Sequence, residues 1–137
     1  MFIRNVISRW IVPLTALRFS IASWAFMGLV GIPAFVFFDL FGGWRWPPYN
    51  PVYDQMIVSI YLAVGLCSLF ALRDPMRHAS FLWFVVWSSL FHGGVMLFHA
   101  LHDPMHIRHL IGDVWILVGG AALGLPLRRA EIFQRNS

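Results

Sequence analysis

Residues 79–101 read ASFLWFVVWSSLFHGGVMLFHAL, and this stretch decides the fold. It contains no Asp, Glu, Lys or Arg. A helix of roughly 20 mostly apolar residues is long enough to cross the hydrocarbon core of a bilayer. The sequence therefore predicts a transmembrane helix here.

Three further apolar stretches meet the same length requirement, at about 19–38, 55–72 and 107–125. Before them, residues 1–14 alternate apolar and polar side chains at helical spacing, as in a helix that lies on the membrane surface. Pro13 is expected to separate this interfacial helix from the first span. The predicted fold class is all-α: residues 1–137 form one integral membrane domain, a bundle of four transmembrane helices with an amphipathic N-terminal helix.

The composition agrees with a membrane protein, because 59% of the chain is hydrophobic and only 12% is charged. All ten basic residues are arginine, and they fall almost entirely at the ends of apolar stretches. This distribution is typical of membrane topology determinants and not of a phosphate-tracking surface, so we expect no nucleic-acid partner.

The arginines also predict an orientation. Two of them, Arg45 and Arg108, lie on one predicted side, and the other eight are Arg4, Arg9, Arg18, Arg73, Arg77, Arg128, Arg129 and Arg135. By the positive-inside rule both termini face the cytoplasm, so residues 39–53 and 102–106 face outward. The expected location is the bacterial inner membrane, with several passes.

Short sequence signals mark the helix ends. Asp74-Pro75 and Asp103-Pro104 are expected to end one span and begin the next, and Asp54 is expected to cap the second span. Gly120 and Gly124 form a small-xxx-small pair that permits close approach of another helix.

Histidines and carboxylates gather around the predicted outer turn. At helical spacing they form two stripes, one on each adjoining helix, that face each other. Imidazole and carboxylate ligands suit zinc, copper or non-haem iron. The candidate metal ligands are His99, His102, Asp103, His106, His109 and Asp113. The alternative is that these histidines are ordinary interfacial residues.

His92 stands apart, because it falls in the middle of a span, where a polar side chain needs a partner. One interpretation is a hydrogen bond to Ser88, Ser89 or a neighbouring helix. The other is axial ligation of haem or bacteriochlorophyll, with Met96 nearby and with Gly93 and Gly94 leaving room for the macrocycle.

The outer loop, residues 39–53, carries five aromatic residues among glycines and prolines. Trp44 and Trp46 are the most prominent of them. Such rings usually lie at headgroup depth. The alternative is a lid over a ligand on the same face, in which these tryptophans contact the cofactor.

Short motifs resemble small four-helix bacterial membrane proteins of an uncharacterised family. They are Leu72-Arg73-Asp74-Pro75, Ser88-Ser89-Leu90-Phe91-His92-Gly93, Met96 and His109-Leu110-Ile111-Gly112-Asp113. The resemblance covers about 58–126 and implies no catalytic residue. In topology the chain also looks like the DoxX-like group, which would imply a membrane partner of redox enzymes, although a cysteine pair is absent.

These patterns favour a non-enzymatic role, because no nucleophile with a base and no phosphate-binding loop is present. The leading expectation is an accessory or assembly subunit of a bacterial inner-membrane complex, an energy-converting or a pigment- or quinone-associated one. Its partners would be the lipid bilayer and other membrane subunits or further copies of the chain. The alternatives are a metal- or haem-binding redox protein that uses the outer histidines, and a histidine-based pH sensor.

Overall fold

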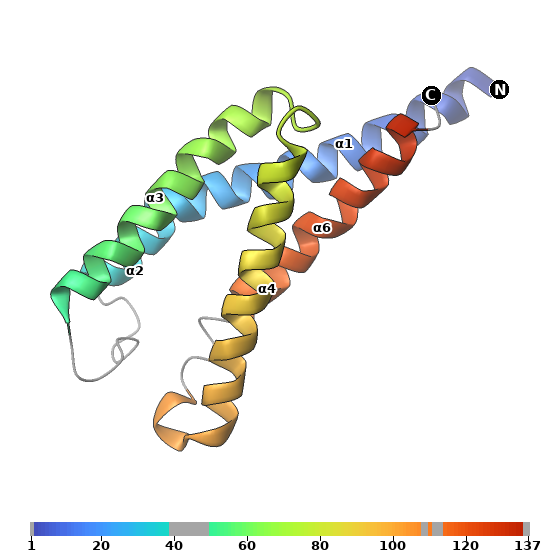
Figure 1. The fold of residues 1–137 in the computed structure, drawn as a ribbon. Helices are drawn as coiled ribbons and strands as arrows, with labels where there is room; N and C mark the ends of the chain where they lie inside the picture. The colour runs from blue at the N-terminus through green and yellow to red at the C-terminus, as the bar shows by residue number, and fades with distance from the viewer. Residues whose placement is uncertain (1, 39–49, 108–109, 111–113, 136–137) are drawn as a thin grey trace.

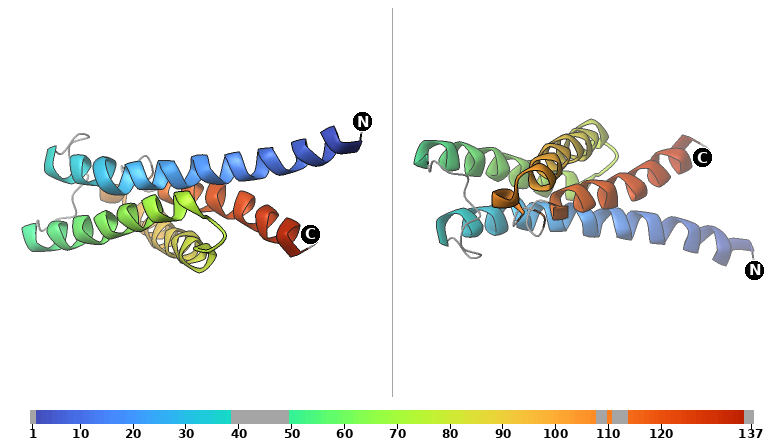
Figure 2. Two further views of the ribbon diagram at one scale, coloured as in Figure 1. Left: turned by 90° about the horizontal axis from the view of Figure 1, so that it is seen from above. Right: turned by 90° about the horizontal axis from the view of Figure 1, so that it is seen from below.

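The computed structural model describes residues 2–38, 50–107, 110 and 114–135, and within these ranges it contains helices and turns but no strand. Four long helical segments run in alternating directions (Figure 1). The N- and C-terminal segments end on the same side of the molecule (Figure 2). The all-helical fold class is therefore confirmed.

The first segment is one continuous helix in three parts: α1 (Phe2–Phe26), the π-helix η1 (Met27–Gly31) and α2 (Ile32–Phe38). Pro13 lies inside α1, and the helix continues through it. The expected boundary at Pro13 is therefore not found, and a separate interfacial helix over residues 1–14 is not confirmed.

The π-helix has a local cause in Pro33, which has no backbone N–H and whose ring would collide with a carbonyl four residues before it in a regular α-helix. The backbone N–H of Ile32 reaches back five residues to the carbonyl of Met27. This wider turn is the single-turn bulge by which helices accommodate such an interruption. It brings Gly28 against Gly65 of α3.

Helix α3 (Pro51–Arg73) begins with Asn50, whose side-chain oxygen accepts hydrogen bonds from the backbone N–H groups of Val52 (3.0 Å) and Tyr53 (3.4 Å). Pro51 occupies the first helical position, which needs no N–H donor. Asp54 was the expected cap, and this prediction is wrong. Asp54 lies in the first turn, where a negative charge interacts favourably with the positive end of the helix dipole.

The third and fourth long segments are α4 (Ala79–His102) and α6 (Val114–Arg135), with the short 3₁₀-helix η2 (Pro104–His106) after α4. In the turn between α3 and α4 the side chain of Asp74 accepts a hydrogen bond from the backbone N–H of Arg77 at 3.2 Å. Asp74-Pro75 ends α3 as expected, but it does not cap α4, which follows His78 without a side-chain cap.

In the part of the chain that the structure describes, three segments are long and apolar enough to cross a membrane: 14–38, 51–73 and 79–102. The predicted spans at 19–38, 55–72 and 79–101 lie within them. The predicted fourth span, 107–125, is not confirmed. Residues 108–109 and 111–113 of it lie outside the described residues, and α6, which begins at Val114, continues past Leu125 through Arg128, Arg129 and Glu131. The charged C-terminal part of α6 distinguishes this helix from the three candidate spans.

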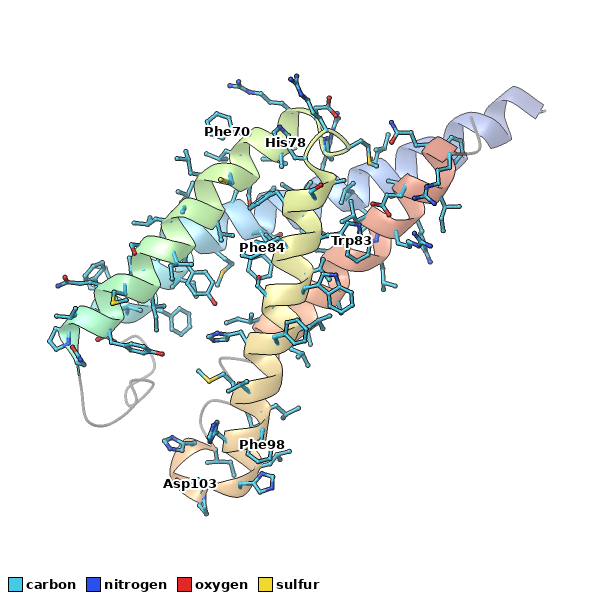
Figure 3. All side chains as sticks on the ribbon, in the orientation of Figure 1. Phe70, His78, Trp83, Phe84, Phe98 and Asp103 are labelled. Carbon is cyan, nitrogen blue, oxygen red and sulfur yellow. The ribbon has the colours of Figure 1, made fainter. Side chains whose placement is uncertain are left out.

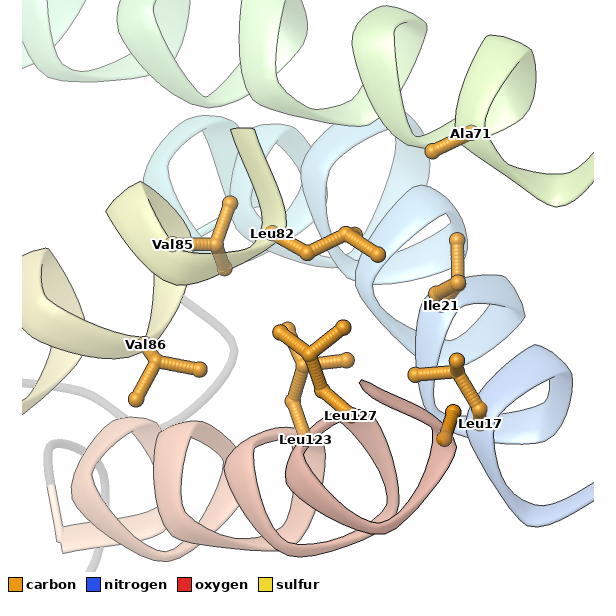
Figure 4. Packing of buried hydrophobic residues seen from close by; sticks show 9 residues of the cluster. Leu17, Ile21, Ala71, Leu82, Val85, Val86, Leu123 and Leu127 are labelled. Atoms are coloured by element: carbon orange, nitrogen blue, oxygen red, sulfur yellow. The ribbon is translucent and has the colours of Figure 1, made fainter. Parts of the chain in front are cut away.

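The main core lies where α1, α4 and α6 meet near the α3–α4 turn (Figure 4). Its buried members are Leu17, Ile21, Ala71, Leu82, Val85, Val86, Leu123, Leu127 and Ala130. A second, smaller group joins α2 to α3 through Ile32, Val36 and Val58. Helices α3 and α4 diverge from the turn that joins them, so α4 packs mainly on α6 and α3 mainly on the first segment (Figure 1).

Small residues set the spacing of α4 and α6. A Cβ atom added to Gly120 would lie 2.6 Å from the Cβ atom of Ser89, and one added to Gly124 would lie 3.3 Å from Val86. The predicted close approach at Gly120 and Gly124 is therefore confirmed. In addition, the indole N–H of Trp24 donates to the carbonyl of Gly119 at 3.4 Å, which joins α1 to α6.

Replacing Gly120 by Ala is expected to destabilise the protein, because the Cβ of Ser89 is fixed to its backbone and α4 and α6 must separate. Overpacking of this kind costs about 1–3 kcal/mol. Gly94→Ala is the matched control: a Cβ at Gly94 meets no atom within 4 Å, so its stability should stay unchanged or rise by up to about 1 kcal/mol. Thermal unfolding in one detergent measures both variants, and equal melting temperatures would contradict the packing argument.

Candidate functional site

The C-terminal end of α4 and the turn after it carry most of the predicted ligands. His92, Met96, His99 and His102 lie on α4, Asp103 ends it, and His106 lies in η2. Figure 3 shows Asp103 at the turn, at the opposite end of α4 from His78. Four predicted residues, Trp44, Trp46, His109 and Asp113, lie outside the described residues.

His102 is held by its own helix. Its Nδ1 atom lies 2.8 Å from the carbonyl oxygen of Phe98, and its ring stacks on the Phe98 ring with centroids 4.2 Å apart. A carbonyl oxygen only accepts hydrogen bonds, so Nδ1 carries the hydrogen in this arrangement. In neutral His102 the Nε2 atom is then the nitrogen with a free lone pair.

The turn after α4 brings a second histidine to a carboxylate. The backbone N–H of His106 donates to the carbonyl of Asp103 at 2.9 Å, and the Nε2 atom of His106 lies 3.5 Å from Oδ2 of Asp103. His99 lies edge-on to Phe98, with ring centroids 5.6 Å apart. The local geometry thus places three histidine rings and one carboxylate within a short length of chain.

These groups do not converge on one point. Among the residues that the structure describes, no three His, Cys, Asp or Glu side chains are arranged to hold a metal ion. A complete site would need His109 or Asp113. The predicted metal site therefore stays a prediction, as does a pH response of these histidines.

His92 is exposed, although it lies well inside an apolar candidate span, residues 79–102. Ser88 and Ser89 both donate their hydroxyl hydrogens to the carbonyl of Val85, at 3.1 and 2.6 Å. The expected bond between His92 and these serines is not formed, and within the described ranges His92 has no hydrogen bond or ion pair.

The two glycines after His92 have different roles. Gly93 is packed against α6, since a Cβ there would lie 2.8 Å from the Cβ of Leu117. Gly94 faces open space, but it lies about 200° around the helix from His92. The interpretation that both glycines make room for a macrocycle beside His92 is therefore wrong. Met96, four residues along, is half-buried.

A polar contact that the sequence did not suggest joins α4 to α6. The indole N–H of Trp83 donates to Oε1 of Glu131 at 2.7 Å, and Nη1 of Arg128 lies 3.6 Å from Oε2 of the same carboxylate. Trp83 lies on the α6 side of α4 (Figure 3). The sequence offered one signal of this contact: Glu131 is a single carboxylate three residues after Arg128, in a helix end rich in arginine.

An aromatic row continues from Trp83 along α4. The rings of Trp83 and Trp87 stack with centroids 6.4 Å apart, and those of Trp87 and Phe91 with centroids 6.1 Å apart. Trp87 and Phe91 are 53% and 71% exposed, so this row faces lipid or another protein.

Comparison with protein families matches residues 12–136, which is nearly the whole chain. The chain belongs to DUF6632, a family of unknown function. The expected uncharacterised family is thus confirmed, and the DUF6632 match gives no link to the DoxX-like group. Searches of curated proteins and of solved structures found no match to this DUF6632 chain.

Removing the Glu131 carboxylate, which joins α4 to α6, should lower the unfolding free energy of this DUF6632 protein. Glu131→Ala leaves the half-buried indole N–H of Trp83 without its acceptor, which is expected to cost about 1–2 kcal/mol of unfolding free energy. Glu131→Gln keeps an acceptor oxygen and should lose less than half as much. Chemical unfolding followed by tryptophan fluorescence measures both, and equal losses would show that the hydrogen bond is unimportant.

Proposed function

We propose that this protein is an accessory or assembly subunit of a bacterial inner-membrane complex. The partners would be other membrane subunits, further copies of the chain, or a pigment, quinone or haem held by such a complex. The three apolar spans support a membrane location. The topological resemblance to DoxX-like proteins would add redox enzymes to the candidate complexes.

The observation that carries this proposal is His92. An ionisable side chain at membrane depth is costly unless it is paired, and it is expected to mark a functional contact. Lipid chains offer no hydrogen bond, and the described part of the chain offers His92 none. A contact with another molecule would satisfy the imidazole.

The surfaces around His92 also support an external partner. Only 28% of the apolar window of α4 and 22% of that of α3 are buried within the chain. Beside His92, Phe91 and Val95 are 71% and 58% exposed. Lipid would suit these apolar side chains equally well, so the imidazole is what distinguishes a protein or cofactor contact from lipid alone.

The proposed orientation places both termini in the cytoplasm. In support, the exposed arginines of the α3–α4 turn and of the α6 end lie toward one side of the molecule, and the histidine turn lies toward the other (Figure 1). Labelling of introduced cysteines from one side of intact cells measures this orientation, with His102→Cys accessible from outside and Gln134→Cys accessible only after permeabilisation.

The partner can be tested by cross-linking in the native host. A photo-crosslinking amino acid in place of Val95, one turn from His92, should capture a discrete partner while His92 is present. His92→Ala should reduce this product at least tenfold. The control position is Leu66 on α3, which is 51% exposed and distant in sequence; a product there should not depend on His92.

The His92→Gln variant, followed by its cross-linked product and its visible absorption, shows which kind of contact His92 makes. His92→Gln keeps a hydrogen-bonding side chain and should retain most of the product if His92 bonds to a partner helix. It should lose the product and any visible absorption if His92 ligates a macrocycle. A stable monomer without cofactor, co-purifying chain or cross-link would contradict the proposal.

A second candidate function is a metal- or haem-binding redox protein that uses the outer histidines. The geometry of His102 favours it, because metal-binding histidines usually donate their other ring N–H to a carbonyl or carboxylate. Here Nδ1 faces the Phe98 carbonyl, which leaves Nε2 for a metal. The remaining ligands would come from the other candidates, His99, Asp103, His106, His109 and Asp113.

Elemental analysis and a visible spectrum of protein never exposed to chelator test this candidate. One equivalent of zinc, copper or iron is expected, with at least a tenfold loss of affinity in His102→Ala. His78→Ala, at the opposite end of α4, is the control and should keep the metal. Absence of metal together with a featureless spectrum would exclude this function.

A further inference from the structure

We infer that the outward face of α6 binds an anionic phospholipid, with the phosphate on Arg128 and Arg129 and an acyl chain along the apolar residues before them. This inference is independent of the proposed partner at His92, because it concerns a different helix.

One face of α6 changes from apolar to basic along its length. Val118 and Leu125 are 48% and 66% exposed, and Ala121 and Ala122 between them are exposed as well. Arg128 is exposed on the next turn, and the adjacent Arg129 is exposed too. The other side of the helix is buried against α1 and α4 through Leu123, Leu127 and Ala130.

The dimensions suit a lipid. At ~1.5 Å per residue, Val118 to Leu125 covers about 10 Å of helix, and Arg128 follows roughly 4.5 Å further on. An acyl chain that packs on the apolar part therefore brings its phosphodiester to the level of the guanidinium groups. Ile132, which is 47% exposed, continues the apolar contact beyond the arginines.

The charges also suit a lipid phosphate. Glu131 is held by Trp83 and lies 3.6 Å from Arg128, so it fixes the position of one guanidinium. Arg129 makes no ion pair with any residue that the structure describes, and its charge is free for an anion. Guanidinium groups bind phosphate through paired, planar hydrogen bonds. The phosphate of a zwitterionic lipid accepts the same bonds, but its choline cation repels the arginines, so an anionic lipid is favoured.

Native mass spectrometry in detergent can test the inference with equal amounts of phosphatidylglycerol and phosphatidylcholine. The wild-type protein should retain the anionic lipid about thirtyfold more, as two basic residues near a headgroup would give. Arg128→Gln with Arg129→Gln should bring the ratio close to one. Arg129→Gln alone leaves the Arg128–Glu131 pair intact and should lower the ratio about fivefold.

The matched control is Arg73→Gln with Arg77→Gln, which removes two exposed arginines at the α3–α4 turn and should keep the wild-type ratio. A wild-type ratio near one would overturn the inference, and so would an equal fall in both double variants. Inorganic phosphate in excess should not displace the lipid; full displacement would show a free-anion site and also overturn the assignment to lipid.

Discussion

The close approach of α4 and α6 is the interaction on which the rest of the structure depends. Glycine at positions 93, 120 and 124 allows backbone and Cβ atoms to meet with no side chain between them. In a bilayer, helices gain little from burying apolar surface, because lipid chains are equally apolar, and tight van der Waals packing supplies the association. The same contact aligns Trp83 with Glu131 and closes the core around Leu123 and Leu127.

Much of the fold could be predicted because three spans are determined by composition alone. Long stretches without charge, ended by Asp-Pro or by arginine, leave few alternatives to membrane helices. The prediction was less successful for α6, since its apolar stretch continues without a break into a charged helix end. It was wrong about Asp54 because Asn50 and Pro51 together make a stronger helix start four residues earlier.

The candidate site was harder to predict, for a physical reason. Helical spacing correctly places His92 and His99 on α4, whereas His102, which was predicted in the turn, is the last residue of the helix. Spacing also does not show what faces each side chain. The structure shows that Gly93 is used for packing on Leu117 and that Ser88 and Ser89 bond to their own helix. It also reveals the Trp83–Glu131 bond, which joins residues 48 positions apart in the chain and leaves no local pattern in the sequence.

The π-helix η1 has a consequence for how the first span meets its neighbours. An extra residue in one turn rotates everything after it by about 100° relative to a regular α-helix. The part of this span before η1 can therefore direct Leu17 and Ile21 at the common core, while α2, after η1, directs Ile32 and Val36 at Val58 of α3. One helix serves two differently placed surfaces, and the register between them is set by a single residue. Insertions and deletions should consequently be tolerated much less between Met27 and Pro33 than at the end of α2.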